Sequence, residues 1–266
     1  MKYKAIISDL DGTLLNSNHR VSQYTKEVVK KVINKGIHFF IATGRHHKDI
    51  DYIRNDLGLD SVFITSNGCR IHDTNKNKLL GYDIEEDIVK GLLNLKVDDS
   101  IHKNIYQEDK WYAEKENKWL DEFIKESNFL YELVDFNELD KFTATKVFFL
   151  GEDYESLVQL QERIEKLYPD KLNIAFSLTN CLEIMPKGVS KGHAIEKVLG
   201  KYNIKPEEAI AFGDGLNDLE MLKIVGKGYI MGNAHDKLIN ALPNNDIIKS
   251  NTEEGLARKL EEIFLL

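Results

Sequence analysis

Two aspartates separated by a single residue follow a short apolar run near the N-terminus. The run at residues 4–8 predicts a buried strand, Asp9 and Asp11 come at its end, and Gly12 follows them. Residues two apart on an extended chain face the same side, with about 7 Å between their β-carbons. Two carboxylates about 6 Å apart repel by about 3 kcal/mol at an effective dielectric constant of about 20. Either one carboxyl therefore keeps a proton or a cation lies beside the pair.

Other structures also suit this stretch when it stands alone. A solvated Asp-Gly turn after a strand is the ordinary interpretation of D-x-D-G, and without further residues it is the better one. A calcium-binding loop is excluded, because placing Gly12 at its sixth position puts Ile7 first and Asn18 twelfth. Such a loop needs an oxygen ligand first and a glutamate last. The choice between a turn and a chemical site therefore depends on the rest of the chain.

A second acidic turn follows another apolar run far along the chain. The stretch 209–222 reads AIAFGDGLNDLEML and places Asp214, Asn217 and Asp218 after a predicted strand. Ligands of an open parallel sheet bind beyond the carboxyl ends of its strands, so we expect these side chains to join Asp9 at one edge. Carboxylate and amide oxygens suit a hard divalent cation such as Mg²⁺ or Mn²⁺. The sequence therefore predicts a metal site at this edge.

Two further polar features belong to the same predicted edge. Thr43 and Gly44 end the run at 37–44 and are expected to open a helix, whose free N–H groups bind phosphate readily. Taken alone, these two residues favour an ordinary helix cap. Lys191 follows Ser190, a predicted N-cap, and a lysine is ordinarily a solvated surface residue. A cation at a helix N-terminus is electrostatically unfavourable, which is understandable if an anion or a carboxylate faces it.

Apolar strands alternate with helical patterns at both ends of the chain. This alternation is typical of a parallel sheet covered by helices on both faces. We therefore expect an α/β fold whose core is a Rossmann-like, doubly wound parallel sheet. The expected strands span 4–8, 37–44, 61–68, 208–215, 227–234 and 246–250, and the expected helices span 22–36, 45–58, 190–203, 217–226, 235–242 and 252–266.

The segment 82–187 has a different, strand-rich pattern. We interpret it as a smaller α+β domain inserted into the first, which leaves 1–81 and 188–266 as the core domain. Tyr106, Trp111 and Tyr112 flank a predicted hairpin turn at Glu108 and Asp109, and packing inside this domain is favoured over contact with a ligand ring. The expected helices of the segment are 84–95, 116–127 and 154–169, and the expected strands are 100–107, 110–115, 144–151, 171–180 and 181–186.

Length, charge and cysteine content narrow the class of protein. A chain of 266 residues has room for two modest domains, and its net charge of −8 argues against a nucleic-acid partner. No apolar run approaches the roughly 18 residues of a membrane span, and a secretory signal is not expected. Cys69 and Cys181 are the only cysteines and are expected to be reduced, as in a cytoplasmic protein.

Four stretches, in this order, resemble the motifs of the haloacid dehalogenase (HAD) superfamily of phosphohydrolases. The similarity looks closest to the Cof-type subfamily, in which an α/β cap is inserted between the second and third motifs. The resemblance covers the whole chain and implies the HAD fold, with 82–187 as the cap. The four stretches are DLDGTLL at 9–15, ATGR at 42–45, KGVSKG at 187–192 and GDGLNDLEML at 213–222.

The resemblance implies separate roles for the aspartates. Asp9 would be the nucleophile that forms an aspartyl-phosphate. Asp11 would protonate the leaving-group oxygen and then deprotonate the hydrolytic water. Mg²⁺ would be held by the Asp9 carboxylate, the main-chain carbonyl of Asp11 and Asp214, with Asp218 nearby.

The remaining motif residues would bind the phosphoryl group and the substrate. Thr43 and Lys191 would contact the transferring oxygens and belong to the catalytic set. Arg45, which follows the second motif, would touch the substrate. The implied phosphate-binding residues are Leu10, Thr43, Gly44, Lys191 and Asn217.

The resemblance thus implies a Mg²⁺-dependent phosphatase that acts on a small phosphorylated metabolite. A sugar phosphate is expected first, and flavin mononucleotide or pyridoxal phosphate are further candidates. A sugar phosphomutase remains an alternative, because some phosphomutases share D-x-D-G-T. A phospho-acceptor signalling domain also clusters aspartates around Mg²⁺, but such domains are about half this length and have no inserted cap.

Overall fold

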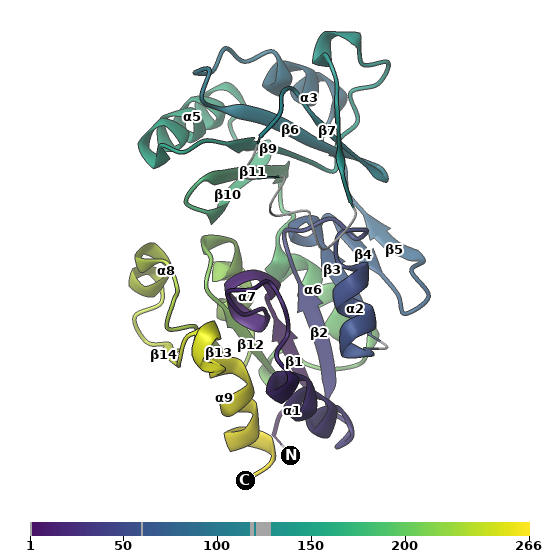
Figure 1. Ribbon diagram of the computed structural model, residues 1–266, viewed down its shortest axis with the longest axis vertical. Helices are drawn as coiled ribbons and strands as arrows, with labels where there is room; N and C mark the ends of the chain where they lie inside the picture. Colours follow the sequence, from purple (N-terminus) through teal and green to yellow (C-terminus); the bar gives the residue numbers. More distant parts are fainter. Residues whose placement is uncertain (1, 60, 118–119, 121–128) are drawn as a thin grey trace.

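The computed structural model describes residues 2–59, 61–117, 120 and 129–266. These residues form two β-sheets, which lie one above the other in Figure 1, and both chain termini lie beside the lower one. Within this part of the chain, no helix is both long and apolar enough to cross a membrane.

The lower sheet brings together strands from both ends of the chain. Its order is β14-β13-β12-β1-β2-β3-β4-β5, and neighbouring strands from β14 to β3 are parallel, as predicted. The last two strands are an antiparallel extension that the sequence did not predict. The strands are β1 (Ala5–Ser8), β2 (His38–Ala42), β3 (Phe63–Thr65), β4 (Arg70–His72), β5 (Lys78–Gly81), β12 (Ala209–Gly213), β13 (Lys227–Ile230) and β14 (Asp246–Ile247).

Helices cover both faces of this sheet because its central strands are apolar on both sides. Ile6 packs in one cluster with α1 and α9, whereas its neighbour Ile7 packs in another with α6, α7 and α8. Strand β1 is therefore held between two layers, and its carboxyl end is fixed in position. The helices are α1 (Gln23–Ile33), α2 (Asp51–Leu57), α6 (Lys191–Lys201), α7 (Leu219–Ile224), α8 (Asp236–Ala241) and α9 (Gly255–Phe264).

The upper sheet is mostly antiparallel, in the order β10-β11-β9-β6-β7-β8. Helices α3 (Glu86–Leu93) and α5 (Tyr154–Leu167) pack on one of its faces around Ile105, Val147 and Leu182. We call this sheet, together with α3 and α5, the cap. Its strands are β6 (His102–Gln107), β7 (Lys110–Ala113), β8 (Tyr131–Leu133), β9 (Lys146–Leu150), β10 (Leu172–Leu178) and β11 (Cys181–Pro186).

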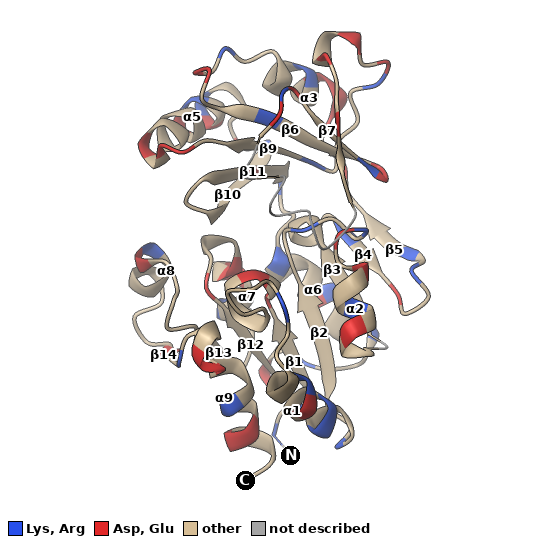
Figure 2. Cartoon of the chain, in the orientation of Figure 1, with Lys and Arg blue, Asp and Glu red and all other residues tan. Residues whose placement is uncertain are grey.

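The cap strands all fall inside the segment 82–187, although the two domain boundaries stay a prediction. The predicted hairpin at Glu108 and Asp109 is confirmed, since β6 and β7 pair antiparallel across it. The predicted helix at 116–127 lies mostly outside the described residues. Figure 2 shows acidic and basic segments interspersed on α5 and α9, in keeping with a modest net charge.

One predicted helix begins later than expected. Residues 45–58 were expected to be helical from the end of β2, but α2 starts only at Asp51. The reason lies in the main chain, because the carbonyls of Thr43 and Arg45 accept hydrogen bonds from Asn67 (3.0 Å) and Ser66 (2.8 Å). These carbonyls are thus unavailable to a helical turn. The prediction that Thr43 and Gly44 open a helix was wrong.

Candidate active site

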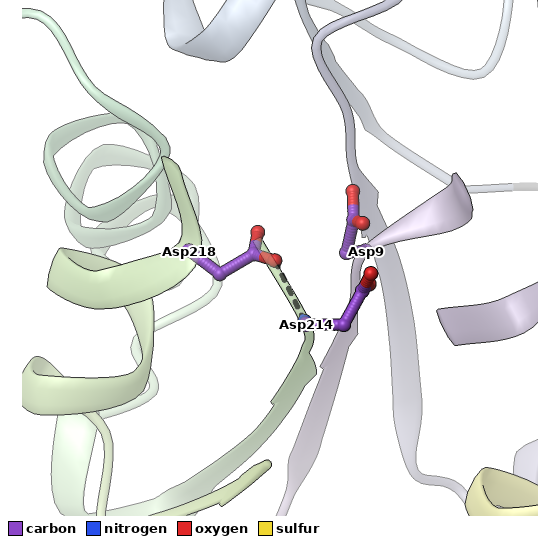
Figure 3. Close-up of side chains that lie close together, drawn as sticks. All are labelled: Asp9, Asp214 and Asp218. Atoms are coloured by element: carbon purple, nitrogen blue, oxygen red, sulfur yellow. Dashed lines mark hydrogen bonds between the residues drawn. The ribbon is translucent and has the colours of Figure 1, made fainter. Parts of the chain in front are cut away.

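Three carboxyl groups from two strand ends meet above the lower sheet. Asp9 follows β1 and Asp214 follows β12, and these strands are neighbours in register. Asp218 comes from the turn before α7. One oxygen of each carboxylate lies within 4.8 Å of the others. Figure 3 shows the three side chains beside one another at the ends of their strands and turn. The predicted convergence of these aspartates is confirmed by this geometry.

Lys191 lies among these carboxylates at the first position of α6. Its Nζ atom is 2.6 Å from Asp9 Oδ1 and 2.7 Å from Asp218 Oδ1, and its side chain has no exposed surface. Burial would lower the pKa of this lysine, but the two aspartates raise the pKa above its ordinary value. The unfavourable position at a helix N-terminus is therefore offset by two anions.

The pKa values of Asp9 and Asp214 remain raised despite the positive charge of Lys191. Burial, followed by the charge of Asp218, raises the pKa of Asp9 well above its usual range. The same two causes raise the pKa of Asp214 to about 7, although Thr13 donates a hydrogen bond of 2.7 Å to it. Closely spaced carboxylates with raised pKa values are a donor set that a hard divalent cation would neutralise. The residues present therefore fit Mg²⁺.

The carboxylate of Asp218 has hydrogen-bond partners within the protein on both of its oxygens. Its Oδ2 atom accepts hydrogen bonds of 3.0 Å from the main-chain N–H groups of Asp214 and Gly215, while Oδ1 faces Lys191. Its carboxylate thus fixes the turn that carries Asp214.

Asp11 is paired with Arg45. Arg45 donates from Nε to Oδ2 at 2.8 Å and from Nη2 to Oδ1 at 2.7 Å. Burial alone would raise the pKa of Asp11, but the charge of Arg45, a hydrogen bond with His19 and the hydrogen bonds of Arg45 hold the pKa well below its ordinary value. Arg45 also donates to Asp49 (3.4 Å) and Tyr52 (3.3 Å), which the sequence did not indicate as partners.

The predicted phosphate-binding residues differ in their burial and in the hydrogen-bond partners that they already have. Thr43 is buried, and its Oγ1 accepts the Arg45 N–H at 3.1 Å. Asn217 donates to Asn67 at 3.0 Å. The Leu10 side chain packs in the core of the lower sheet, so its main chain alone is placed to contact a phosphoryl group.

A buried polar network that the sequence did not reveal joins the cap to this site. Lys146 on β9 and Glu183 on β11 form an ion pair, and both side chains are 3% exposed. Lys146 also donates to the Gly44 carbonyl at 2.8 Å, and Asn67 donates to Glu183 at 2.6 Å. Charged residues within the apolar strands 144–151 and 181–186 were the signal that could have pointed to this network.

A pocket lies between the cap and the lower sheet. Its catalytic side is formed by the predicted residues, and its other side comes from the cap strands. The lining residues are Asp9, Asp11, Thr43, Gly44, Arg45, Tyr106, Trp111, Leu120, Lys146, Phe148, Leu150, Ser177, Leu178, Cys181, Glu183 and Asn217.

A family model described as haloacid dehalogenase-like hydrolase matches residues 6–260. The chain belongs to the haloacid dehalogenase-like hydrolases. This hydrolase is 38% identical over 266 residues to a Haemophilus influenzae protein named as a phosphatase without a stated substrate; the match covers 99% of this chain and 98% of the relative. It is 32% identical over 258 residues to a Yersinia pseudotuberculosis protein named HMP-PP phosphatase, with 97% and 94% covered.

Solved structures agree with this assignment. A haloacid dehalogenase-like hydrolase from Bacillus subtilis superimposes on this hydrolase with a TM-score of 0.86 at 25% identity, covering 98% of this chain and 99% of that one. The predicted family, the α/β fold and the phosphatase class are confirmed. The roles of individual residues in this phosphatase stay predictions.

Proposed function

We propose that this phosphatase hydrolyses a small phosphorylated metabolite in a Mg²⁺-dependent reaction that passes through a phosphorylated Asp9. The observation that carries the proposal is the buried cluster of Asp9, Asp214 and Asp218 around Lys191, at one end of the pocket. The relatives named as phosphatases support the reaction class.

The first step would be attack by an Asp9 carboxylate oxygen on phosphorus. An oxygen–phosphorus bond forms to Asp9 while the bond to the leaving-group oxygen breaks. Lys191 lies 2.6 Å from Asp9 and would hold its carboxylate in line for the attack. Thr43 lines the same pocket, where its hydroxyl would donate to a phosphoryl oxygen.

Asp11 would move the protons of both steps. It would donate a proton to the leaving oxygen, then accept one from the water that attacks the phosphorus of phosphorylated Asp9. Arg45 donates to both carboxylate oxygens of Asp11 and favours its ionised form, so release of at least one oxygen by Arg45 would let Asp11 take up the proton that it donates. We propose this release as a step of substrate binding.

Asp9, Asp214 and the main-chain carbonyl of Asp11 would hold Mg²⁺. The bound ion would neutralise charge on the phosphoryl oxygens. The raised pKa values of Asp9 and Asp214 support this assignment, because burial and the charge of Asp218 disfavour their ionised forms unless a cation lies beside them.

Hydrolysis of para-nitrophenyl phosphate tests the proposal. We expect turnover with Mg²⁺ and none with a chelator, loss of turnover in Asp9→Asn, and slower formation and hydrolysis of the phosphoenzyme in Asp11→Asn. The matched control is Asp236→Asn, because Asp236 is an exposed aspartate on α8. Full turnover by Asp9→Asn, or turnover independent of divalent cations, would overturn the proposed mechanism.

A further inference from the structure

The turn at residues 66–68, between β3 and β4, lies against two of the four motif stretches. Its main-chain N–H groups donate to the carbonyls of Thr43 and Arg45 in the second stretch. A β-carbon on Gly68 would collide with the main-chain carbonyl of Ser190, the N-cap of α6 in the third stretch. The turn is therefore packed closely against the loops that carry these two motifs.

The side chain of Asn67 extends these contacts to the cap and to the fourth motif stretch. Its Nδ2 atom donates to Glu183 Oε2 on β11 at 2.6 Å, and its Oδ1 atom accepts from Asn217 Nδ2 at 3.0 Å. The residue is 1% exposed and has φ +54°, a left-handed conformation that asparagine adopts more readily than most residues. One buried amide thus joins a cap carboxylate to a predicted phosphate-binding residue.

Glu183 determines which way this amide points. Its carboxylate is paired with Lys146 and offers only acceptor oxygens to Asn67. If the Asn67 amide were reversed, its Oδ1 would face this carboxylate and its Nδ2 would face the Asn217 amide nitrogen. Two buried hydrogen bonds would become two repulsive contacts, which is costly away from water.

Asn67 in turn determines which way Asn217 points. Because Oδ1 of Asn67 is an acceptor, Asn217 directs its Nδ2 atom toward it. An amide nitrogen carries two hydrogens, so Asn217 can donate the second one to a phosphoryl oxygen in the pocket that it lines together with Asp9. A reversed Asn217 amide would present its oxygen to the negatively charged phosphoryl group instead, and the contact would be repulsive.

We propose that Asn67 is a positioning residue, whose amide is oriented by Glu183 and holds Asn217 in the orientation that donates to the phosphoryl group. This inference rests on the proposed function, because it places the phosphoryl group at Asp9, beside Asn217. A residue of the cap thereby acts on the phosphoryl group through two asparagines.

Reversing the polarity of the Asn67–Glu183 hydrogen bond tests the proposal. Asn67→Asp tolerates the left-handed backbone but sets two carboxylates against each other. Glu183→Gln keeps an oxygen toward Lys146 and turns an N–H₂ group toward Asn67, whose amide then reverses. With para-nitrophenyl phosphate and Mg²⁺, we expect each single variant to lower kcat by at least about fivefold.

The double variant Asn67→Asp/Glu183→Gln should recover kcat to within about threefold of the wild type. The new amide at position 183 donates to the new carboxylate at position 67, whose other oxygen still accepts from Asn217. A double variant no faster than the slower single variant would overturn the proposal, as would single variants with the wild-type kcat.

Asn245→Asp is the matched control for the change of an amide to a carboxylate. Asn245 donates to the Gly228 carbonyl at 3.1 Å and precedes β14, at the end of the sheet opposite the aspartates. This variant should keep kcat within about twofold of the wild type. A loss equal to that of Asn67→Asp would show that the effect is not specific to position 67.

A second pair of variants tests whether Asn67 acts through Asn217. Asn67→Gly removes the amide without straining a backbone of positive φ. It should lower kcat in the wild type but by less than about twofold in Asn217→Ala, because the group that it orients is already absent. Losses that simply multiply would contradict a positioning role through Asn217, and this pair stands in should Asn67→Asp fail to fold.

The proposed function and this inference fail in different ways. If the wild-type chain does not hydrolyse para-nitrophenyl phosphate with Mg²⁺, the proposed function is wrong and the inference falls with it. If the wild type is active and the double variant shows no recovery, the proposed function stands and the role of Asn67 is overturned.

Discussion

Arg45 binds both carboxylate oxygens of Asp11, at 2.8 Å from Nε and 2.7 Å from Nη2. The two residues are separated by 34 positions and come from the turns after β1 and β2. A guanidinium in this bidentate arrangement stabilises the ionised acid. The same group that is expected to donate a proton is thus held in its ionised form until Arg45 moves.

Replacing this arginine should change the acidity of Asp11. In Arg45→Gln we expect the pKa of Asp11 to rise, because the charge of Arg45 no longer opposes burial and only His19 still lowers this pKa. Titration of the Asp11 carboxyl by NMR measures this pKa. Arg54→Gln on α2 is the control variant. The wild-type pair stabilises the fold above about pH 3.9, and this contribution is lost as the pH falls through the lowered folded pKa. An unchanged pKa in Arg45→Gln would refute this relationship.

Removing the buried lysine should destabilise the fold. Lys191→Met leaves Asp9 and Asp218 without their cation, and breaking such a buried pair typically costs about 3–5 kcal/mol. Lys201→Met, at the other end of α6 and exposed, should cost less than about 1 kcal/mol. Urea denaturation without Mg²⁺ compares the free energies of unfolding of the two variants. Equal values would argue against the ion cluster.

The acidic cluster should give the protein an unusual dependence on pH. The pKa of Asp214 is about 7, so the folded protein retains a proton that the unfolded chain loses near pH 3.9. Stability without metal should therefore fall as the pH rises between these values. Mg²⁺ competes with this proton, so its stabilising effect should be larger at about pH 8 than at about pH 6.

Denaturation with and without Mg²⁺ at these two pH values measures the effect. Asp214→Asn should remove the difference between them, whereas Asp236→Asn should preserve it. Stabilisation by Mg²⁺ that is the same at both pH values would show that Asp214 does not share its proton site with the metal.

Alanine substitutions at two glycines distinguish the effect of backbone strain from the effect of contact with the site, because both glycines have a positive φ. Gly12 has φ +75° and Gly36 has φ +85°, but a β-carbon on Gly12 would collide with the Asp214 carboxylate, whereas one on Gly36 meets nothing within 4 Å. Gly36→Ala should cost about 1 kcal/mol for its backbone conformation alone. Gly12→Ala should cost clearly more and weaken Mg²⁺ binding by about tenfold, or about 1.4 kcal/mol. Equal effects on stability and on Mg²⁺ affinity would contradict this contrast.

The parallel part of the lower sheet was predictable because its strands are continuous apolar runs separated by amphipathic helices. Strands β4 and β5 were not, since they span only Arg70–His72 and Lys78–Gly81, and β5, at the edge of the sheet, is largely exposed. Strands of three or four residues are too short to show a clear alternation of apolar and polar residues. The late start of α2 also escaped prediction, because its cause is a set of hydrogen bonds to Ser66 and Asn67 on another loop.

The site residues that directly follow a strand were predictable from the sequence. Asp9 and Asp214 each come directly after an apolar run, and parallel topology places such residues at one edge. The Lys146–Glu183 pair and its link to Asn67 were not predictable, because Asn67 and Glu183 are separated by 116 positions, and Asn67 lies in the turn between β3 and β4 whereas Glu183 lies on β11 of the cap. Likewise, Arg45 was expected to touch substrate, and its pairing with Asp11 is visible only in three dimensions.

The central claim is that Asp9 carries the phosphoryl group. Borohydride reduces an acyl phosphate, so quenching Asp11→Asn during turnover of para-nitrophenyl phosphate with Mg²⁺ should convert Asp9 to homoserine. Mass spectrometry of the peptide containing residues 4–16 would detect the change. The account predicts homoserine at position 9 only when substrate is present. Turnover with an unmodified Asp9, or reduction at another residue, would contradict it.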